Sequence, residues 1–363
     1  MSFWSKIFGG SKAEDDGALR ITIHQAIHHF GFRASTAQDR YGDFAPVIES
    51  TERMANTPEG ITAYMDLMTP YLREDFRLPW GETLASHAHE WAPPGDAAHA
   101  ADSDAFVDGA RQVYESRPSA LSAAIYAFAC NLVGWRARGQ DYKVSPEGAA
   151  TLQDWGDRGW DIGIGHVNRT LDGGQGLSKS DVPLLASVCS IALTRGSPEA
   201  LTQVFGLWEQ VDPTDLAMMT QRAYSLLPRW YGSAEELEQY ARSCMEATRP
   251  VYGAGAYGYI YGWLCRLADF DIEDTGCDID LADQGMKDLR AYFPCNYLHN
   301  MHAQLLSWGD REERVLEIFN EGLKVIDYRA WTFADEDNGM RNAVVALAVA
   351  RNEAAGDNIH LIE

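Results

Sequence analysis

The sequence predicts an all-α protein built from irregular helical hairpins, stacked as a repeat array or packed as a large helical bundle. Helix-start signals recur along the chain, and apolar residues follow them at spacings of three and four. Runs of alternating β-branched residues bounded by turn residues, which would indicate strands, are missing. The 363 residues are 46% hydrophobic, so the chain can bury a sizeable core.

The N-terminal part is predicted as a tip followed by a small helical region. Residues 1–18 form a flexible tip and linker, because 9–18 (GGSKAEDDGA) are polar and carry glycines. Residues 19–91 are expected to be helical, with one helix beginning at Thr57-Pro58-Glu59. Residues 92–104 (APPGDAAHAADSD) are the clearest loop and separate this region from the rest of the chain.

Residues 105–357 are predicted as a helical-repeat domain, followed by a tail over 358–363. The Ala-rich stretch 119–138 has the length and composition of a buried helix, and a final helix is expected over about 340–355. Helix starts are predicted at Ser145, Ser197, Ser233, Asp278 and Asp310. The last four lie 32 to 45 residues apart, which leaves room for two helices and two turns in each interval.

One block carries a resemblance to a known kind of protein. Leu227-Pro228-Arg229-Trp230-Tyr231-Gly232-Ser233, followed by an acidic capping turn and Tyr240-Ala241-Arg242, resembles a motif of bacterial helical proteins of unknown function with a tetratricopeptide-like architecture. The resemblance covers residues 180–330 and implies tetratricopeptide-like hairpins but no activity. Small residues do not recur at the fixed period of regular tetratricopeptide repeats. The block also predicts a turn, with Ser233 capping the next helix.

The charge of the chain indicates the kind of partner it can bind. Asp and Glu number 53 against 30 Lys and Arg, giving a net charge of −23. Such a surface repels nucleic-acid phosphates and anionic lipids, and it attracts a basic protein. The scattered cysteines form no C-x-x-C pair, and no stretch reaches the length of a membrane helix. We therefore expect a cytoplasmic protein, with lipid contact by the apolar residues 3–8 as a less favoured alternative.

The motifs for catalysis are incomplete. Gly253-Ala-Gly255-Ala-Tyr-Gly258 matches a dinucleotide fingerprint by letter, but a helical segment precedes it instead of a strand. Nothing in the sequence indicates a cofactor, so an enzyme is not the favoured class. The alternative is a metal-dependent enzyme in an all-α scaffold, with His87, His89 and Glu90 as the densest group of metal-ligand side chains. Against it, residues two apart on a helix point in different directions.

Protein binding is the favoured function. Aromatic anchors surrounded by charge are typical of binding hot spots, and an acidic run favours a basic partner. The predicted contact residues are Trp230, Tyr231, Tyr257, Asp269, Asp271, Glu273 and Asp274. Two forms of this function remain open: an adaptor, or an immunity-type inhibitor that neutralises a basic toxin.

Overall fold

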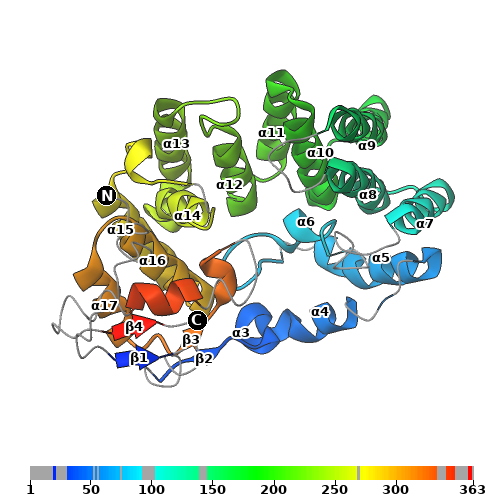
Figure 1. Cartoon of the computed structure of the whole chain (residues 1–363). Helices are drawn as coiled ribbons and strands as arrows, with labels where there is room; N and C mark the ends of the chain where they lie inside the picture. Colours follow the sequence, from blue (N-terminus) through cyan, green and yellow to red (C-terminus); the bar gives the residue numbers. More distant parts are fainter. Residues whose placement is uncertain are drawn as a thin grey trace. The chain divides into compact units, whose positions relative to one another are not determined.

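A computed structural model confirms the all-α class. It describes residues 19–21, 31–51, 54, 57–73, 76–91, 103–138, 145–267, 270–332, 341–347 and 359–361. Nearly all regular structure in these residues is helical (Figure 1). Contacts between residues divide the chain into two compact units: unit 1 combines residues 1–42 with 226–363, and unit 2 is residues 43–225.

Unit 2 is a series of packed helices. Its elements are α4 (Ala45–Thr51), α5 (Pro58–Arg73), α6 (Leu84–His87), α7 (Ser103–Ser116), α8 (Ala120–Arg138), α9 (Pro146–Asp172), the 3-10 turn η2 (Lys179–Asp181), α10 (Val182–Arg195), α11 (Pro198–Val211) and α12 (Leu216–Ser225). Each helix from α7 to α11 packs against the next, and α8 also contacts α10. Helices that contact their first and second neighbours are the arrangement expected of stacked hairpins.

Helix α9 approaches its neighbours closely because glycines face them. A Cβ atom added at Gly163 would lie 2.4 Å from the Val188 side chain of α10, and one added at Gly159 would lie 2.9 Å from the Ala127 carbonyl oxygen of α8. Both distances are shorter than real Cβ contacts. The backbone of α9 can therefore pack at this distance only with glycine at these positions.

Unit 1 has the same kind of organisation. It contains α3 (Ala37–Tyr41), α13 (Ala234–Tyr252), α14 (Gly255–Leu264), the 3-10 turn η3 (Glu273–Thr275), α15 (Ile279–Tyr292), α16 (Asn296–Trp308), α17 (Glu312–Asn320) and the 3-10 turn η4 (Tyr328–Ala330), and residues 341–347 are also helical. Each helix from α13 to α17 packs against the next, and α14 also contacts α16.

Two short pairs of parallel strands, which the sequence did not predict, belong to unit 1. Strand β1 (Leu19–Ile21) pairs with β4 (Ile359–Leu361), and β2 (Arg33–Ala34) pairs with β3 (Val325–Ile326). Strands of two or three residues are too short to show an alternating pattern, and their partners are far away in the sequence. These pairs explain why the first residues of the chain belong to the same unit as its C-terminal helices.

The predicted helix starts agree well with the structure. Ser145, Ser197, Ser233 and Asp278 each accept a hydrogen bond from a backbone N–H of the first helical turn, at 3.0 to 3.3 Å. The start expected at Asp310 lies two residues later, at Glu312, because Asp310 adopts a left-handed φ of 51°. None of the described helices is long and apolar enough to cross a membrane.

The predicted boundaries differ from those of the two units. The predicted tip, residues 1–18, and residues 92–102 of the predicted loop 92–104 lie outside the described residues, whereas Ser103 and Asp104 begin α7. The units divide after Gly42 and after Ser225 instead. Within the predicted tail, residues 359–361 form β4.

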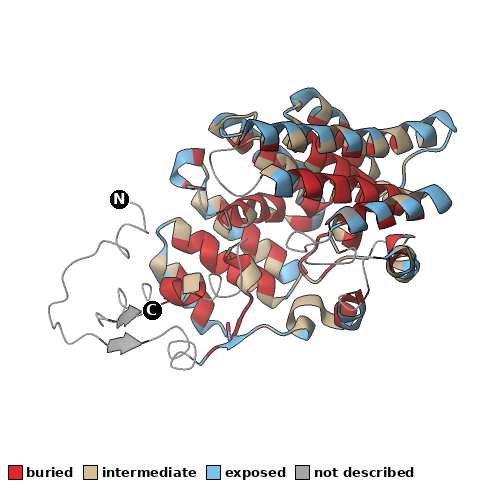
Figure 2. Cartoon of the chain, turned by 45° about the vertical axis from the view of Figure 1, so that its right-hand side comes forward, coloured by how far each residue is buried: buried red, intermediate tan, exposed pale blue. Residues whose placement is uncertain are grey.

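Most of the buried residues of each unit lie on its helices (Figure 2). Helix α14 is the extreme case, because every residue except Trp263 is buried. A helix that is apolar on all sides belongs in a core. The α14 tyrosines are therefore core residues, which bears on the predicted contact residues.

Candidate functional site

The predicted acidic run lies in the connection between α14 and α15. We call residues 271–280 the acidic segment; its exposed acids are Asp271, Glu273, Asp274, Asp278 and Asp280. Ile272 and Thr275, only 3% and 5% exposed, anchor the segment to unit 1. The Thr275 hydroxyl donates to the Ile272 carbonyl oxygen at 2.7 Å. Because the buried residues alternate with the acids, the carboxylates are directed to solvent. Asp269 lies outside the described residues.

Part of the charge of the acidic segment is uncompensated. Asp278 lies 3.7 Å from the guanidinium of Arg242, and Asp280 lies 3.9 Å from that of Arg311. Among the residues that the structure describes, Asp271, Glu273 and Asp274 form no ion pair. Three acids within four residues of the chain that form no ion pair produce a local negative potential.

Tyr257 is in the core and not on the binding surface that the sequence predicted. It is 0% exposed. Its hydroxyl donates to Glu238 Oε2 at 2.8 Å and accepts from the backbone N–H of Asp278 at 2.8 Å. The Tyr261 hydroxyl donates to the same Glu238 oxygen at 2.7 Å. Tyr257 thus connects α13 to the acidic segment and supports that segment from beneath.

Trp230 and Tyr231 precede α13, and both are half-buried. Their ring centroids are 6.2 Å apart. Gly232 permits this turn, because a Cβ atom there would lie 2.3 Å from the Leu226 carbonyl oxygen. The turn leads directly into α13, and the η3 part of the acidic segment also packs against α13. Both predicted contact features are therefore attached to one helix.

The predicted metal ligands His87 and His89 both lie beside the Glu90 carboxylate, but their arrangement is not that of a metal site. His87 Nε2 lies 2.7 Å from Glu82 Oε2 and its Nδ1 lies 3.3 Å from Glu90 Oε2, while its ring stacks on Trp91. Burial opposes protonation of His87, but the two carboxylates outweigh it and raise its pKa, which removes the lone pairs that a metal would need. His89 is buried against Phe128, with its Nε2 4.0 Å from Glu90 Oε1, and burial lowers its pKa to about 4.

The surroundings of these histidines give the metal alternative no support. Within the described residues, no three His, Cys, Asp or Glu side chains are grouped so that they could hold a metal ion. His87 and His89 instead approach different oxygens of the Glu90 carboxylate, Oε2 and Oε1.

The structure reveals a buried polar cluster that sequence reasoning missed. The Asp215 cluster consists of Asp215 with Thr83, Ser86 and Trp208. Asp215 Oδ2 accepts from Ser86 Oγ at 2.6 Å, from Trp208 Nε1 at 3.0 Å and from Thr83 Oγ1 at 3.3 Å, and Oδ1 accepts from the Ala217 N–H at 3.1 Å. Burial, reinforced by Asp212 and Glu82, raises the pKa of Asp215 to about 6.

The Asp215 cluster has a positioning role. Asp215 is 0% exposed, so its carboxylate is not available to a substrate in this conformation. Its bonds tie the segment around α6 to α11 and α12. The sequence around Asp215 does not predict this cluster, because Ser86 and Asp215 are 129 residues apart.

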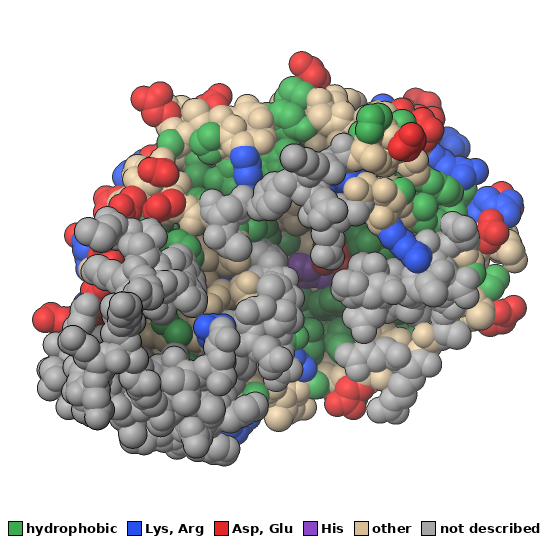
Figure 3. All heavy atoms as spheres, viewed as in Figure 1, with side chains coloured by type: hydrophobic (Ala, Val, Ile, Leu, Met, Phe, Trp, Pro, Cys, Tyr) green, Lys and Arg blue, Asp and Glu red, His purple; other side chains and the backbone are tan. Residues whose placement is uncertain are grey.

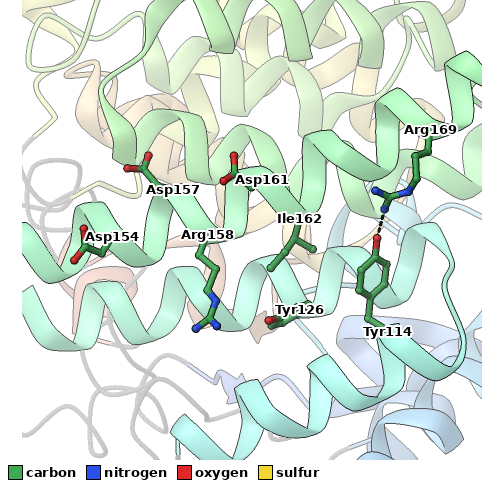
Figure 4. A pocket seen from close by; sticks show the side chains of 8 residues that line it. All are labelled: Tyr114, Tyr126, Asp154, Asp157, Arg158, Asp161, Ile162 and Arg169. Atoms are coloured by element: carbon green, nitrogen blue, oxygen red, sulfur yellow. Dashed lines mark hydrogen bonds between the residues drawn. The ribbon is translucent and has the colours of Figure 1, made fainter.

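An open groove of about 670 Å³ lies over α7, α8 and α9 (Figure 4). Arg169 donates to the Tyr114 hydroxyl, while Asp154, Asp157 and Asp161 lie along α9. Asp157 pairs with Arg195 at 2.7 Å. The groove combines both signs of charge with aromatic rings, and this composition is typical of a surface for polar contacts rather than of an apolar ligand pocket.

Comparison of the chain with family models, with curated proteins and with solved structures finds no match. The resemblance carried by residues 227–233 therefore stays a prediction.

Proposed function

We propose that this chain is a protein-binding helical module that engages a basic protein partner through the acidic segment. The observation that carries the proposal is the group of three exposed carboxylates, Asp271, Glu273 and Asp274, without ion pairs among the described residues. Charge complementarity speeds the encounter with a partner and rejects partners of the wrong sign. An adaptor and an immunity-type inhibitor are the two forms of this proposal.

The rigidity of the acidic segment favours binding. Ile272 and Thr275 hold it from below, and the Tyr257 hydroxyl holds the backbone N–H of Asp278. A surface that is ordered before binding loses less conformational entropy when the partner arrives. The carboxylates therefore need little rearrangement to meet Lys or Arg side chains.

The charge of the rest of the surface supports the same kind of partner. Asp and Glu side chains are spread over the described part of the face drawn in Figure 3, with Lys and Arg between them. The half-buried Trp230 and Tyr231, at the beginning of α13, add aromatic contact area of the kind found in hot spots. All six cysteines are free, in keeping with the reducing cytoplasmic compartment that we propose for the protein.

Affinity capture with matched variants tests the proposal. The full chain is immobilised and exposed to lysate of its own organism at about 50 mM and about 500 mM salt. The test variant carries Asp271→Asn, Glu273→Gln and Asp274→Asn. The control removes the same charge from exposed acids of unit 2 that lie outside the groove, by Glu59→Gln, Asp172→Asn and Glu199→Gln. We expect one basic protein to be retained by the wild type and the control at low salt, and to be lost at high salt.

The test variant should lose this partner at both salt concentrations. Its thermal stability should stay within about 0.5 kcal/mol of wild type, because surface substitutions have small effects. A partner that binds the test variant and the wild type equally well at low salt would show that the acidic segment is not the binding surface.

A further inference from the structure

A second cavity lies within unit 2, apart from the acidic segment. It has a volume of about 360 Å³ and is lined by α5, the start of α8, the C-terminal half of α9 and the connection from α9 to α10. Leu72 and Leu121 supply apolar surface, and Asp181 supplies the one carboxylate among the described lining residues. No Lys or Arg belongs to this lining. An anionic ligand would therefore meet a like charge and no counter-charge, which disfavours it.

Two side chains of the lining bring hydrogen-bond donors that the described part of the protein does not use. Gln175 lies in the connection from α9 to α10, and Ser180 lies in η2. Within the described residues, neither the Gln175 amide group nor the Ser180 hydroxyl forms a hydrogen bond. A side-chain amide offers two donors and an acceptor, and a hydroxyl offers one donor and two lone pairs. Both groups are therefore available to a ligand.

Three other hydroxyls of the lining have already used their protons. Thr69 Oγ1 donates to the Met65 carbonyl oxygen at 2.6 Å, and Ser178 Oγ donates to Asp181 Oδ2 at 2.9 Å. Thr170 Oγ1 donates to the carbonyl oxygen four residues earlier, at 3.2 Å. Since each hydroxyl has one proton and two lone pairs, these three offer only acceptor lone pairs to a ligand.

Ser119 is a fourth acceptor, because its proton is directed to a neighbouring serine. Ser122 Oγ donates to the Arg117 carbonyl oxygen at 2.9 Å. The 3.1 Å contact between the two serine hydroxyls therefore has Ser119 as its donor. The lining thus combines four acceptor hydroxyls with the unused donors of Gln175 and Ser180.

Asp181 adds a further acceptor. Its Oδ2 accepts from the Ser178 N–H at 2.8 Å and from the Ser178 hydroxyl, and among the described residues its Oδ1 has no hydrogen-bond partner. His166 also lines the cavity, but its Nδ1 is buried, so we assign it no hydrogen bond to a ligand. Burial, reinforced by Arg169, lowers the pKa of His166, and the ring therefore adds no positive charge at pH 7.

We infer that this cavity binds a neutral polyhydroxyl ligand, either a small open-chain polyol or a single sugar ring. Each alcohol group of such a ligand donates one hydrogen bond and accepts up to two. Its O–H groups can donate to the acceptor hydroxyls and to Asp181, while its oxygens accept from Gln175 and Ser180. An ammonium group has no acceptor for these two donors. The C–H surface of the ligand would pack against Leu72 and Leu121.

Saturation-transfer NMR on the full chain tests the inference, with D-sorbitol and D-glucose as the two probes. The controls are 1,6-hexanediol, which has the same carbon chain with only terminal hydroxyls, and 1,6-diaminohexane, which is cationic. The titrations are made at about 150 mM salt, so that general attraction of the amine to an acidic surface is screened. We expect a probe to bind and both controls to give no signal. Tighter binding of sorbitol would indicate an open-chain polyol, and tighter binding of glucose a sugar ring.

Gln175→Ala and Ser180→Ala test the assigned donors. Neither side chain forms a hydrogen bond within the described residues, so we expect both variants to fold. Loss of a neutral hydrogen bond should weaken binding of the probe about 3-fold in each variant and about 10-fold in the double variant. Gln203→Ala removes an exposed glutamine of α11 that is outside the cavity lining, and it should leave the affinity unchanged.

The inference is overturned if neither sorbitol nor glucose binds, or if 1,6-hexanediol or the diamine binds as tightly as the better probe. Wild-type affinity in the double variant would overturn it too, as would equal losses in Gln175→Ala and Gln203→Ala. The cavity belongs to unit 2, and Asp271, Glu273 and Asp274 belong to unit 1. The double variant should therefore still retain the basic partner in affinity capture, which separates this inference from the proposed function.

Discussion

Asp215 in unit 2 and Asp283 in unit 1 are both sheltered from solvent, yet their pKa values shift in opposite directions. Asp215 is 0% exposed, and its donors are two hydroxyls, an indole N–H and a backbone N–H. The Asp283 side chain is 15% exposed and accepts from His302 Nε2 and Lys287 Nζ, both at 2.7 Å, and from Arg314 at 3.4 Å. Burial raises the pKa of Asp215 to about 6. At Asp283 burial acts in the same direction, but His302 and Lys287 outweigh it, and the pKa falls well below its usual range.

The difference shows that neutral hydrogen bonds do not fully replace water around a carboxylate. Four donors hold Asp215, and burial still dominates its pKa. At Asp283 the hydrogen bonds from His302 and Lys287, together with the positive charge of Lys287, reverse the balance, because both favour the ionised form. His302 fits the same network as a neutral ring, since Nε2 donates to Asp283 while Nδ1 accepts from Arg290 at 3.0 Å.

A carboxylate suits the Asp215 cluster, although burial makes its charged form unfavourable. Oδ2 faces the indole N–H of Trp208, and Oδ1 faces the backbone N–H of Ala217. An asparagine would set its amide N–H₂ against one of these two donors in either orientation. The cluster therefore needs an acceptor at both oxygen positions, and aspartate supplies two.

The largest effect is expected for Asp215→Ala. This change leaves the Trp208 indole N–H and the Ala217 N–H without their acceptor inside a closed site, whereas the Ser86 hydroxyl can still donate to Thr83 Oγ1, 2.6 Å away. Each buried unsatisfied donor costs about 1 to 3 kcal/mol, and removal of the buried charge offsets part of the sum. We expect unit 2 to lose about 3 kcal/mol of unfolding free energy in urea denaturation.

The exposed Asp161→Ala on α9 is the control for Asp215→Ala. It should change the unfolding free energy by less than about 0.5 kcal/mol. Equal effects of the two substitutions would mean that the hydrogen bonds of the Asp215 cluster contribute nothing to stability, and the comparison with Asp283 would lose its basis.

A smaller loss is expected for Asp283→Ala. His302 Nε2 loses its acceptor, and Lys287 and Arg314 lose a shared carboxylate, although the side chain of Lys287 is 41% exposed and solvent screens its charge. We expect unit 1 to lose about 2 kcal/mol of unfolding free energy, measured by urea denaturation. Asp280 lies on the same helix, and its side chain is 90% exposed. Asp280→Ala should therefore change the unfolding free energy by no more than a few tenths of a kcal/mol. A larger loss for Asp280→Ala than for Asp283→Ala would contradict the network.

The sequence predicts the helices far better than it predicts these networks. Caps such as Ser197 and Ser233 lie next to the donors that they bind, so a local pattern identifies them. The burial of Tyr257 could have been recognised, because α14 is apolar on every side. The Asp215 cluster could not have been recognised from the sequence, since Ser86 lies 129 residues from Asp215 and only the tertiary fold brings them together. The exposure of Asp271 and Glu273 follows from their alternation with buried residues in a connection.

The smallest predicted effect is a difference in pH dependence between the two units. The pKa of Asp215 is higher in the folded state, about 6, than the unfolded value of about 3.9. The folded state therefore binds this proton more tightly, and the contribution of Asp215 to the stability of unit 2 rises by about 1 kcal/mol as the pH falls from 7 to 5. His89, whose folded pKa of about 4 lies below its unfolded value, contributes a loss over the same range, so the effect of Asp215 has to be measured as a difference between wild type and Asp215→Ala. Asp283 has the lower pKa in the folded state, so its contribution is constant over this range and is lost only below about pH 4.

Hydrogen exchange measured by mass spectrometry separates the two contributions within one chain. After correction for the intrinsic exchange rate, protection of α12 in the wild type relative to Asp215→Ala should rise between pH 7 and pH 5, because the other titrating groups are common to both proteins. Protection of α15 in the wild type relative to Asp283→Ala should stay level over the same range. If the difference in α12 protection does not rise as the pH falls, then neutral donors are sufficient to hold a buried carboxylate ionised, and the charged neighbour of Asp283 is not what distinguishes it from Asp215.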